Sequence, residues 1–462
     1  MTTPPDIEAI LAEARKARDR LGPNTHDRIA EAMHARSSEI ARAAVRITGR
    51  APVEWDLLAD KVLTSRLLGF PIMLVGLAVV LWMTIAGANV PSSMLASGLF
   101  WIHGHLVAGA EAIGAPWWLT GFLFDGVYLG VAWVVAVMLP PMAIFFPIFT
   151  LLEDVGYLPR VAFNLDRFFR WAGAHGKQAL TMSMGFGCNA AGVVACRIIE
   201  SPRERTLAIL TNNFTLCNGR WPTIIMIASV FVAAKFPPAW AGIAATACVL
   251  AVVLVGTVTT FIVCKLLSST VLKGEASHFY LELPPYRRPS VWRVVYRSII
   301  DRTIFVLGRA MVVAAPAGGL IWLLGNITPG GQSLMVTFSN ALEPIGWVIG
   351  LDGVILLAFI IAIPANEIIV PTIIMAYMAT SKMTELDATA TGDLFRANDW
   401  TMLTAVCVML FSLLHYPCAT TTWTIWRETG SRKIALWSNL LPLGIAVVVC
   451  AAVAGVWRLV AV

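Results

Sequence analysis

Seven side chains that can bind a metal ion occur in short polar segments of otherwise apolar sequence. They are Cys188, Asn189, Cys217, Asn366, Glu367, His415 and Cys418. Thiolate, imidazole, carboxylate and amide groups together suit a borderline divalent transition metal such as Fe(II), Mn(II) or Zn(II). Sodium or calcium is better served by oxygen ligands alone. The set therefore predicts a transition-metal path, although its spacing matches no short metal-binding motif.

Two of these segments interrupt apolar stretches and leave halves too short to cross a bilayer. The stretch 178–196 is broken at Gly185-Phe186-Gly187-Cys188-Asn189, and 351–379 is broken at Pro364-Ala365-Asn366-Glu367. Both ends of the first stretch carry basic residues, the signature of the cytoplasmic side. We therefore expect two re-entrant hairpins, the first entering from the cytoplasm and the second from outside. The alternative is that one of them is an ordinary kinked span.

A further polar cluster follows each hairpin. The first cluster contains Asn212, Asn213, Cys217 and Asn218 before Pro222, and the second contains His415, Pro417 and Cys418 before Thr420–Thr422. Unwound backbone is tolerated in a membrane only where it lines a cavity or is buried in protein. An ionised carboxylate near the centre of a bilayer costs about 3 kcal/mol or more, so Glu367 needs a proton, a partner or a cation. The remaining cysteines fit the ordinary role of small apolar residues: Cys196, Cys248, Cys264, Cys407 and Cys450.

Charge is scarce and unevenly distributed along the elements that must position these residues. Of 462 residues, 58% are hydrophobic and only 13% are charged, against about 25% in a soluble domain. Residues 1–66 hold 11 of the 34 Lys and Arg and 10 of the 28 Asp and Glu. This distribution excludes a soluble enzyme, a disordered chain and a nucleic-acid binder. It predicts an all-α polytopic membrane protein with a short, soluble, helical N-terminal extension.

Basic residues divide the chain into five parts with a defined orientation. We expect a cytoplasmic extension over 1–66 with helices at 3–20 and 26–48. A peripheral first span at 67–88 follows, with outer interfacial helices reaching residue 124. A repeat over 125–265, a cytoplasmic loop over 266–302 and a second repeat over 303–462 complete the chain. Each repeat has the order span, hairpin, span, span, with spans at 125–152, 206–234, 238–265, 303–326, 400–425 and 434–457. Opposite orientations of the two would make an inverted-topology repeat, with its substrate site where the broken segments meet.

The first-half motifs resemble those of one transporter family. Leu152-Glu153-Asp154, Gly156-Tyr157-Leu158-Pro159-Arg160, the hairpin motif at 185–189 and Ser201-Pro202-Arg203-Glu204-Arg205 are similar to the membrane domain of FeoB-type ferrous-iron transporters. The hairpin motif at 364–367 and His415-Tyr416-Pro417-Cys418 look like one branch of that family. The resemblance, over roughly 55–460, implies a ferrous-iron permease of two gate-type repeats. It matches Cys188 to the family's proposed metal-path cysteine and Cys418 to a second one.

One departure from the family concerns its GTPase domain. The chain contains no G-x-x-x-x-G-K-[ST] phosphate loop, and Gly173-Ala174-His175-Gly176-Lys177 lacks the required spacing. We therefore expect no nucleotide-binding residues and no catalytic residues. A small GTPase on a separate polypeptide would dock on the N-terminal helices, unless transport here is independent of GTP. A small accessory protein and a homo-oligomer are further possible partners.

These observations predict a multi-pass importer of Fe2+ in the cytoplasmic (inner) membrane of a bacterium, with its N-terminus in the cytoplasm. Fe2+ would be the transported substrate, and no cofactor is expected to be bound permanently. Iron would meet Asn366 and Glu367 first, and then Cys418, His415, Cys217 and Cys188. An alternative is a transporter of nucleosides or other small organic solutes built from the same repeats. A regulatory or scaffold protein whose N-terminal helices bind a soluble partner is the third candidate.

Overall fold

The structure, a computed structural model, describes residues 12–13, 16–17, 20, 25–44, 55–65, 67–274, 285–378, 380 and 388–460. The chain forms two units that divide near residue 60. In the first unit, α2 (Thr25–Ala44) confirms the helix predicted over 26–48. The helix predicted over 3–20 lies mostly outside the described residues, as do Lys382, Glu385 and Asp387 of the loop after the second hairpin.

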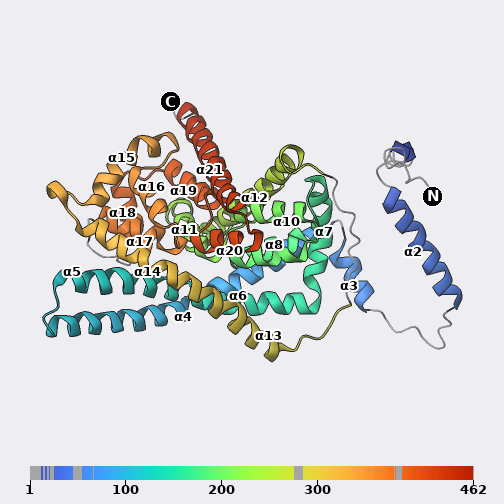
Figure 1. The fold of residues 1–462 in the computed structure, drawn as a ribbon, viewed down its shortest axis with the longest axis horizontal. Helices are drawn as coiled ribbons and strands as arrows, with labels where there is room; N and C mark the ends of the chain where they lie inside the picture. The colour runs from blue at the N-terminus through green and yellow to red at the C-terminus, as the bar shows by residue number, and fades with distance from the viewer. Residues whose placement is uncertain are drawn as a thin grey trace, which may run out of the picture. The chain divides into compact units, whose positions relative to one another are not determined.

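The second unit begins at Asp60, within a short helix that is followed by two long, antiparallel ones. These are α3 (Trp55–Leu63), α4 (Gly69–Ala112) and a continuous run of α5 (Trp117–Thr120), the π-helical η1 (Gly121–Tyr128) and α6 (Leu129–Val155). Figure 1 shows α4 and α6 side by side. With 44 residues at 1.5 Å each, α4 is about 66 Å long, roughly twice the hydrocarbon thickness of a bilayer.

Helix α4 is one continuous helix, whereas the sequence predicted a span at 67–88 followed by separate interfacial helices up to residue 124. The first span does not end near 88, because α4 continues through Pro91 to Ala112 without interruption. The chain turns at residues 113–116, and the next helix begins at Trp117 rather than near 125. The prediction failed because residues 89–124, which contain tryptophans but no Lys or Arg, were interpreted as helices lying in the outer interface. The apolar sequence on both sides of Pro91 sustains one helix.

The first predicted repeat contains short helices around two breaks. Its elements after α6 are α7 (Tyr157–Trp171), α8 (Gln178–Gly185), α9 (Asn189–Ala195), η2 (Cys196–Ile198), α10 (Pro202–Thr211), η3 (Asn212–Phe214), η4 (Asn218–Arg220), α11 (Trp221–Ile227), η5 (Ala228–Val232), η6 (Ala233–Lys235) and α12 (Pro238–Thr270). Helices α8 and α9 have eight and seven residues, pack against each other and are separated by the predicted break at 186–188. The helix after them is also interrupted, at 215–217.

The second predicted repeat shows the same pattern of breaks. The predicted loop before it contains α13 (Val291–Arg297) and most of η7 (Ser298–Ile304), which continues directly into the repeat. The elements of the repeat are α14 (Phe305–Asn326), η8 (Pro329–Gly331), α15 (Leu334–Val348), α16 (Gly353–Ile361), η9 (Asn366–Ile368), α17 (Ile369–Tyr377), α18 (Ala388–Ala397), α19 (Met402–Leu414), α20 (Ala419–Thr429) and α21 (Arg432–Val460). Helices α16 and α17 pack together across the break at 362–365. The chain is interrupted again at 415–418, between α19 and α20. Both hairpin breaks are thus observed, whereas their entry sides and the inverted orientation of the repeats stay predictions.

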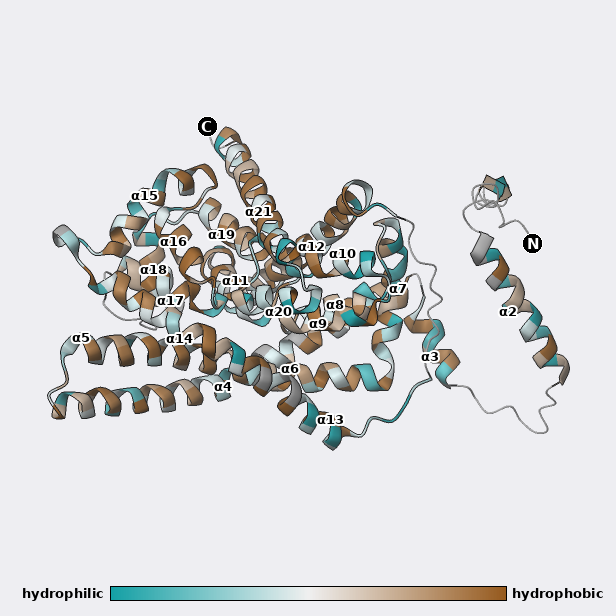
Figure 2. Cartoon of the chain, in the orientation of Figure 1, coloured by the Kyte–Doolittle hydropathy of each residue, from teal (hydrophilic) through white to brown (hydrophobic). Residues whose placement is uncertain are grey.

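The described residues confirm an all-α polytopic membrane protein. They contain seven helices long and apolar enough to cross a membrane, and no strand. One further pair, Leu334–Val348 with Gly353–Ile361, is bent by 107°. Apolar residues predominate along the long helices α4, α6, α12 and α21, whereas α7 and α13 carry many of the polar residues (Figure 2). Close approach of α14 to η1 and α6 depends on small residues, since a Cβ on Gly130 would lie 2.9 Å from Cα of Gly318.

Candidate functional site

In each half of the chain, one backbone hydrogen bond joins the hairpin to the broken helix that follows it. The N–H of Asn218, just after Cys217, donates a hydrogen bond of 3.2 Å to the carbonyl of Gly187. In the second half, the N–H of Ala419, just after Cys418, donates one of 2.8 Å to the carbonyl of Ile363. Each broken helix is therefore tied to the break of its own hairpin. These bonds also satisfy backbone groups that unwinding would otherwise leave unpaired inside a membrane.

A small cavity of about 30 Å³ lies where these breaks meet. Six of the seven predicted residues line it: Cys188, Asn189, Cys217, Asn366, Glu367 and Cys418. A cavity needs roughly 10–15 Å³ to hold a water molecule, so this one has room for a single ion or one or two waters. The sequence predicted that an ion would meet these residues one after another along a path. In the structure six of them instead surround one cavity.

Each of the three cysteines stands directly before a short helix. Cys188, Cys217 and Cys418 all have extended backbone conformations at the N-cap positions of α9, η4 and α20. Each of these cysteines therefore lies where the helix is interrupted, and each lines the cavity. The Sγ atom of Cys418 also lies 3.3 Å from Oγ1 of Thr421.

Asn189 and Asn212 fix the first hairpin. With its amide oriented to suit its neighbours, Asn189 donates to the carbonyls of Gly185 (3.3 Å) and Thr215 (3.2 Å). Asn212 donates from Nδ2 to the carbonyl of Asn189 at 3.0 Å. Asn212 also fills the space beside Gly192, where a Cβ would lie 2.6 Å from its Oδ1. Asn189 is therefore both a cavity residue and a structural tie between the hairpin and the broken helix.

The Glu367 side chain lies against Gly219. A Cβ on Gly219 would be 2.7 Å from Cδ of Glu367 and closer still to Oε1. Only glycine at this position leaves room for the carboxylate where it stands. Nδ2 of the cavity residue Asn218 is buried and has no hydrogen-bond partner among the described residues. This N–H donor is therefore available to a water molecule that accompanies an ion.

His415 lies behind the cavity wall rather than in it. Its ring is fully buried, and Nδ1 lies 2.9 Å from the carbonyls of both Phe411 and Ser412, which places the ring proton on Nδ1. Its Nε2 lies 3.4 Å from Oδ1 of the cavity residue Asn366. With the proton on Nδ1, Nε2 can only accept, so a hydrogen bond to Asn366 requires the Asn366 amide to turn its Nδ2 toward the ring. In that orientation His415 would position Asn366 rather than contact an ion directly.

In this conformation the cavity is not a closed metal cage. Among the described residues, no group of three or more His, Cys, Asp or Glu side chains is arranged to hold a metal ion together. Cys188, Cys217, Cys418 and Glu367 share the cavity wall without converging on one point. That geometry differs from a structural metal site, in which protein side chains complete the coordination.

Arg220, which was not among the residues predicted from the sequence, is the most unusual residue of this region. Its side chain is fully buried, and NH1 donates 2.9 Å hydrogen bonds to the carbonyls of Asn213 and Leu413. NH2 bonds Oδ1 of Asn213 (3.0 Å) and the carbonyls of His415 (3.2 Å) and Tyr416 (3.0 Å). A second tie runs from Nδ2 of Asn213 to the carbonyl of His415, at 2.6 Å. A lone arginine in an apolar stretch, between Cys217 and Pro222, was the available signal.

Comparison with known families gives matches in both halves of the chain. A family model described as "Nucleoside recognition" (Gate) matches residues 135–231 and 307–432, one segment in each predicted repeat. A second model, "Ferrous iron transport protein B C terminus", matches residues 249–301 between them. No solved structure matches the chain.

Curated relatives cover most of this chain. A protein from Porphyromonas gingivalis named "Fe(2+) transport protein A/Fe(2+) transporter FeoB fusion protein" is 27% identical over 437 residues, which is 84% of this chain and 50% of that protein. Proteins named "Fe(2+) transporter FeoB" from Staphylococcus aureus (28% over 398 residues; 83% and 56%) and Campylobacter jejuni (27% over 391; 82% and 61%) also match. The chain thus spans about half to three fifths of the length of these relatives.

Proposed function

Because this chain is an FeoB-type membrane domain, we propose that it conducts ferrous iron across the membrane through the cavity at the four breaks. The relatives named as Fe(2+) transporters support the substrate. The observation that carries the proposal is the common cavity wall of Cys188, Cys217, Cys418 and Glu367. These groups come from both halves of the chain and are the ligand types that a transition metal prefers.

The open arrangement of the ligands is consistent with transient binding of an ion in transit, not with permanent metal binding. An ion that must pass needs binding favourable enough to enter and weak enough to leave. Thiolates would favour Fe2+ over Ca2+ and Mg2+, whereas Glu367 and Asn366 would replace part of the ion's hydration shell. His415 would hold Asn366 in place.

Substitution of the two cysteines from opposite halves tests this role. We expect Cys188→Ser and Cys418→Ser to reduce ⁵⁵Fe2+ uptake by vesicles containing the purified chain at least about tenfold, because a neutral serine hydroxyl is a much poorer ligand than a thiolate for a borderline transition metal. Cys248→Ser and Cys450→Ser are the matched controls, since neither lines the cavity. Normal uptake by both cavity variants would contradict the proposal.

The size of the cavity disfavours the organic-solute alternative. Sites for small organic molecules usually have about 300–1,000 Å³, roughly ten times or more the 30 Å³ available here. In the vesicle assay, competition by unlabelled nucleosides would favour that alternative, whereas competition by Mn2+ or Zn2+ would place the substrate among divalent transition metals.

We further propose that the chain lies in the inner membrane with its N-terminus in the cytoplasm and works with a separate GTPase. The helical spacing of α2 places Ile29, Met33 and Ile40 on one face, which would suit a docking helix. The fused relative suggests an accessory protein like its Fe(2+) transport protein A part. Iron flux in vesicles that contain this chain alone, unchanged by added GTPase, would refute the need for that partner.

A further inference from the structure

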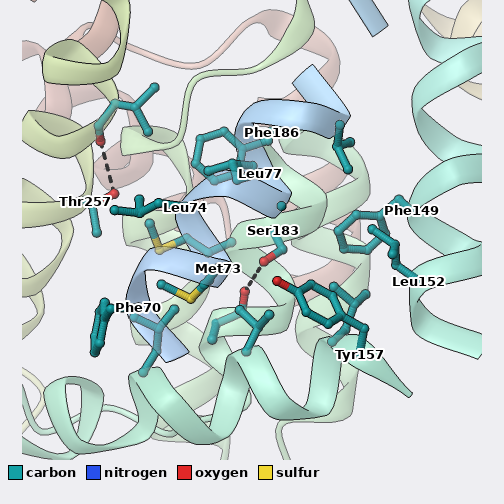
Figure 3. Close-up of a pocket in the computed structure, with 18 of the residues that line it drawn as sticks. Phe70, Met73, Leu74, Leu77, Phe149, Leu152, Tyr157, Ser183, Phe186 and Thr257 are labelled. Atoms are coloured by element: carbon teal, nitrogen blue, oxygen red, sulfur yellow. Dashed lines mark hydrogen bonds between the residues drawn. The ribbon is translucent and has the colours of Figure 1, made fainter. Parts of the chain in front are cut away.

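A second, larger cavity lies between the first hairpin and the peripheral helices. It has a volume of about 230 Å³ and is bounded by α4, α6, α7, α8 and α12 (Figure 3). Its wall is almost entirely apolar, with Phe70, Met73 and Leu77 on α4 and Phe149 and Leu152 on α6. An apolar cavity of about 150 Å³ already stays dry and accepts a hydrocarbon guest.

Only three polar side chains lie in this wall, and two of their hydroxyl protons are already used by backbone carbonyls. Ser183 Oγ donates to the carbonyl of Ala179 at 2.8 Å, and Thr257 Oγ1 donates to that of Val253 at 3.0 Å, as the dashed lines in Figure 3 show. The phenol of Tyr157 is the remaining polar side chain of the wall. The chemistry of the cavity therefore selects a hydrocarbon chain.

The cavity wall includes residues that reach the surface facing the bilayer. Phe168 on α7 and Leu254 on α12 are 42% and 45% exposed, although both line the cavity. Next to them, α12 exposes Val258 and Ile262, an apolar surface expected to contact lipid. In contrast, Met182 and Phe186 at the back of the cavity are only 6% and 8% exposed. The cavity thus extends from a lipid-facing surface to the first hairpin.

Basic and aromatic side chains flank this entrance. Arg167 directly precedes Phe168, and Lys265 lies one turn after the cavity residue Phe261. The ammonium of Lys265 lies 5.6 Å from the ring centroid of Trp171, a side chain that is 60% exposed. The neighbouring acid, Asp166, is paired with Arg170 at 2.8 Å. Exposed cations beside a tryptophan at a helix end are typical of contact with anionic lipid headgroups.

We propose that this cavity binds one acyl chain of an anionic bilayer phospholipid, with the headgroup beside Arg167 and Lys265. The acyl chain would enter between α7 and α12, and its end would contact Met182 and Phe186. Phe186 belongs to the break that carries Cys188 two residues later. The lipid therefore contacts the hairpin of the ion cavity from its far side.

Photo-crosslinking in vesicles tests the proposal with the whole chain. The probe is phosphatidylglycerol with a diazirine near the end of one acyl chain, and the readout is the position of the adducts by mass spectrometry. We expect adducts on the buried residues Met182 and Phe186. Adducts confined to outward-facing residues such as Val258 and Ile262 would overturn the proposal, and this comparison requires no variant to fold.

Two neighbouring residues of α12 give a matched pair of variants. Thr257→Trp fills the cavity with a ring that displaces about two or more methylenes, so adducts on Met182 should fall about tenfold. Val258→Trp places the same ring in the bilayer and should leave these adducts unchanged. Equal labelling of the two variants, when both are monodisperse, would contradict an acyl chain in the cavity.

Two further experiments test whether the headgroup is anionic and whether the acyl chain belongs to a phospholipid or to a free fatty acid. Arg167→Gln with Lys265→Gln should reduce labelling by the phosphatidylglycerol probe to the level of a phosphatidylcholine probe, whereas Lys433→Gln on α21 should not. Equal labelling by both probes in the unaltered protein would refute the anionic headgroup. Loss of the adducts on addition of oleate would identify a free fatty acid instead of a phospholipid.

The effect on transport rests on the proposed function. If the acyl chain braces the first hairpin, ⁵⁵Fe2+ uptake should differ between Thr257→Trp and Val258→Trp. Equal uptake would refute the bracing role. Crosslinking reports lipid binding whether or not iron is transported, so failure of the lipid site and failure of the iron path are distinguishable.

Discussion

Arg220 places a permanent positive charge beside the cavity proposed for a cation. Its charge is distributed over four backbone carbonyls and one amide oxygen, and none of its hydrogen bonds in the described residues goes to a carboxylate. Three of those carbonyls, of Leu413, His415 and Tyr416, belong to the other half of the chain. Arg220 therefore holds the two broken helices together, and its donors stabilise unwound backbone that lies away from water.

Loss of these bonds should destabilise the protein strongly. Arg220→Gln leaves several buried carbonyls without a donor, so we expect a loss of about 3 kcal/mol or more in the free energy of unfolding. Arg220→Lys keeps the charge but offers fewer donors and should rescue only part of this loss. Thermal unfolding of the detergent-solubilised protein measures both, with the exposed Arg427→Gln as control. A melting temperature of Arg220→Gln equal to that of the control would be incompatible with the joining role.

A substitution at Gly219 tests whether iron uptake depends on the position of the Glu367 carboxylate. In Gly219→Ala the new methyl group would overlap the Glu367 carboxylate, which must move away from its place at the cavity. We expect ⁵⁵Fe2+ uptake to fall about tenfold, a change of about 1.4 kcal/mol, while the amount of folded protein is retained. Gly242→Ala is the matched control, because nothing lies within 4 Å of a Cβ at that position. Unchanged uptake in Gly219→Ala would show that the position of Glu367 is unimportant.

At the scale of the elements, α3 is fastened to α7 by a polar cluster outside the spans. Arg160, only 2% exposed, donates from Nε and NH2 to the Asp60 carboxylate at 2.9 and 3.2 Å. Tyr286 donates to the same carboxylate at 2.8 Å, and its ring lies 4.1 Å from the guanidinium carbon of Arg160. The cluster thus connects three segments that are distant in sequence. Arg160 belongs to the motif that first indicated the family, which gives that motif a structural role.

This cluster predicts a specific pH dependence of stability. The hydrogen bond from Arg160 lowers the pKa of Asp60 below its usual value of 3.8. The carboxylate therefore stabilises the fold at pH values above about 4, and this contribution is lost as pH falls through the lowered pKa. Asp60→Asn should reduce stability by about 1–2 kcal/mol at pH 7. The difference should shrink below pH 4, so thermal unfolding across this range checks the sign, and a difference that grows with acidity would contradict it.

The two hairpin breaks and the end of α4 show which features of the fold could be predicted from the sequence. Gly185, Gly187 and Pro364 identified both hairpin breaks correctly, because glycine and proline act on the local backbone. The end of α4 could not be placed, since apolar residues on the two sides of Pro91 look alike whether the helix continues or stops. The convergence of the breaks depends on contacts between distant segments, such as the bond from Asn218 to Gly187. The roles of Arg220 and Gly219 depend on such contacts as well.

For the whole molecule, the number of membrane crossings determines on which side of the membrane the C-terminus lies. If each of the seven candidate spans crosses once and the bent pair 334–361 does not, the termini lie on opposite sides. With the N-terminus in the cytoplasm, the C-terminus after α21 would face outward. A C-terminal alkaline phosphatase fusion should then be active, and a C-terminal green fluorescent protein should be dark. The reverse result would mean that one hairpin crosses completely.

The long helix α4 has a practical consequence for imaging. Beyond Gly98 it carries Gly104 and Gly109, and a Cβ at any of these three positions would meet nothing within 4 Å. The α4–α5 turn at residues 113–116 therefore offers a place to graft a rigid helical domain or an antibody epitope without disturbing the packed cavities. Such a marker would give single-particle images of this small membrane protein an asymmetric feature for alignment, and it would identify one face of the bilayer in every image.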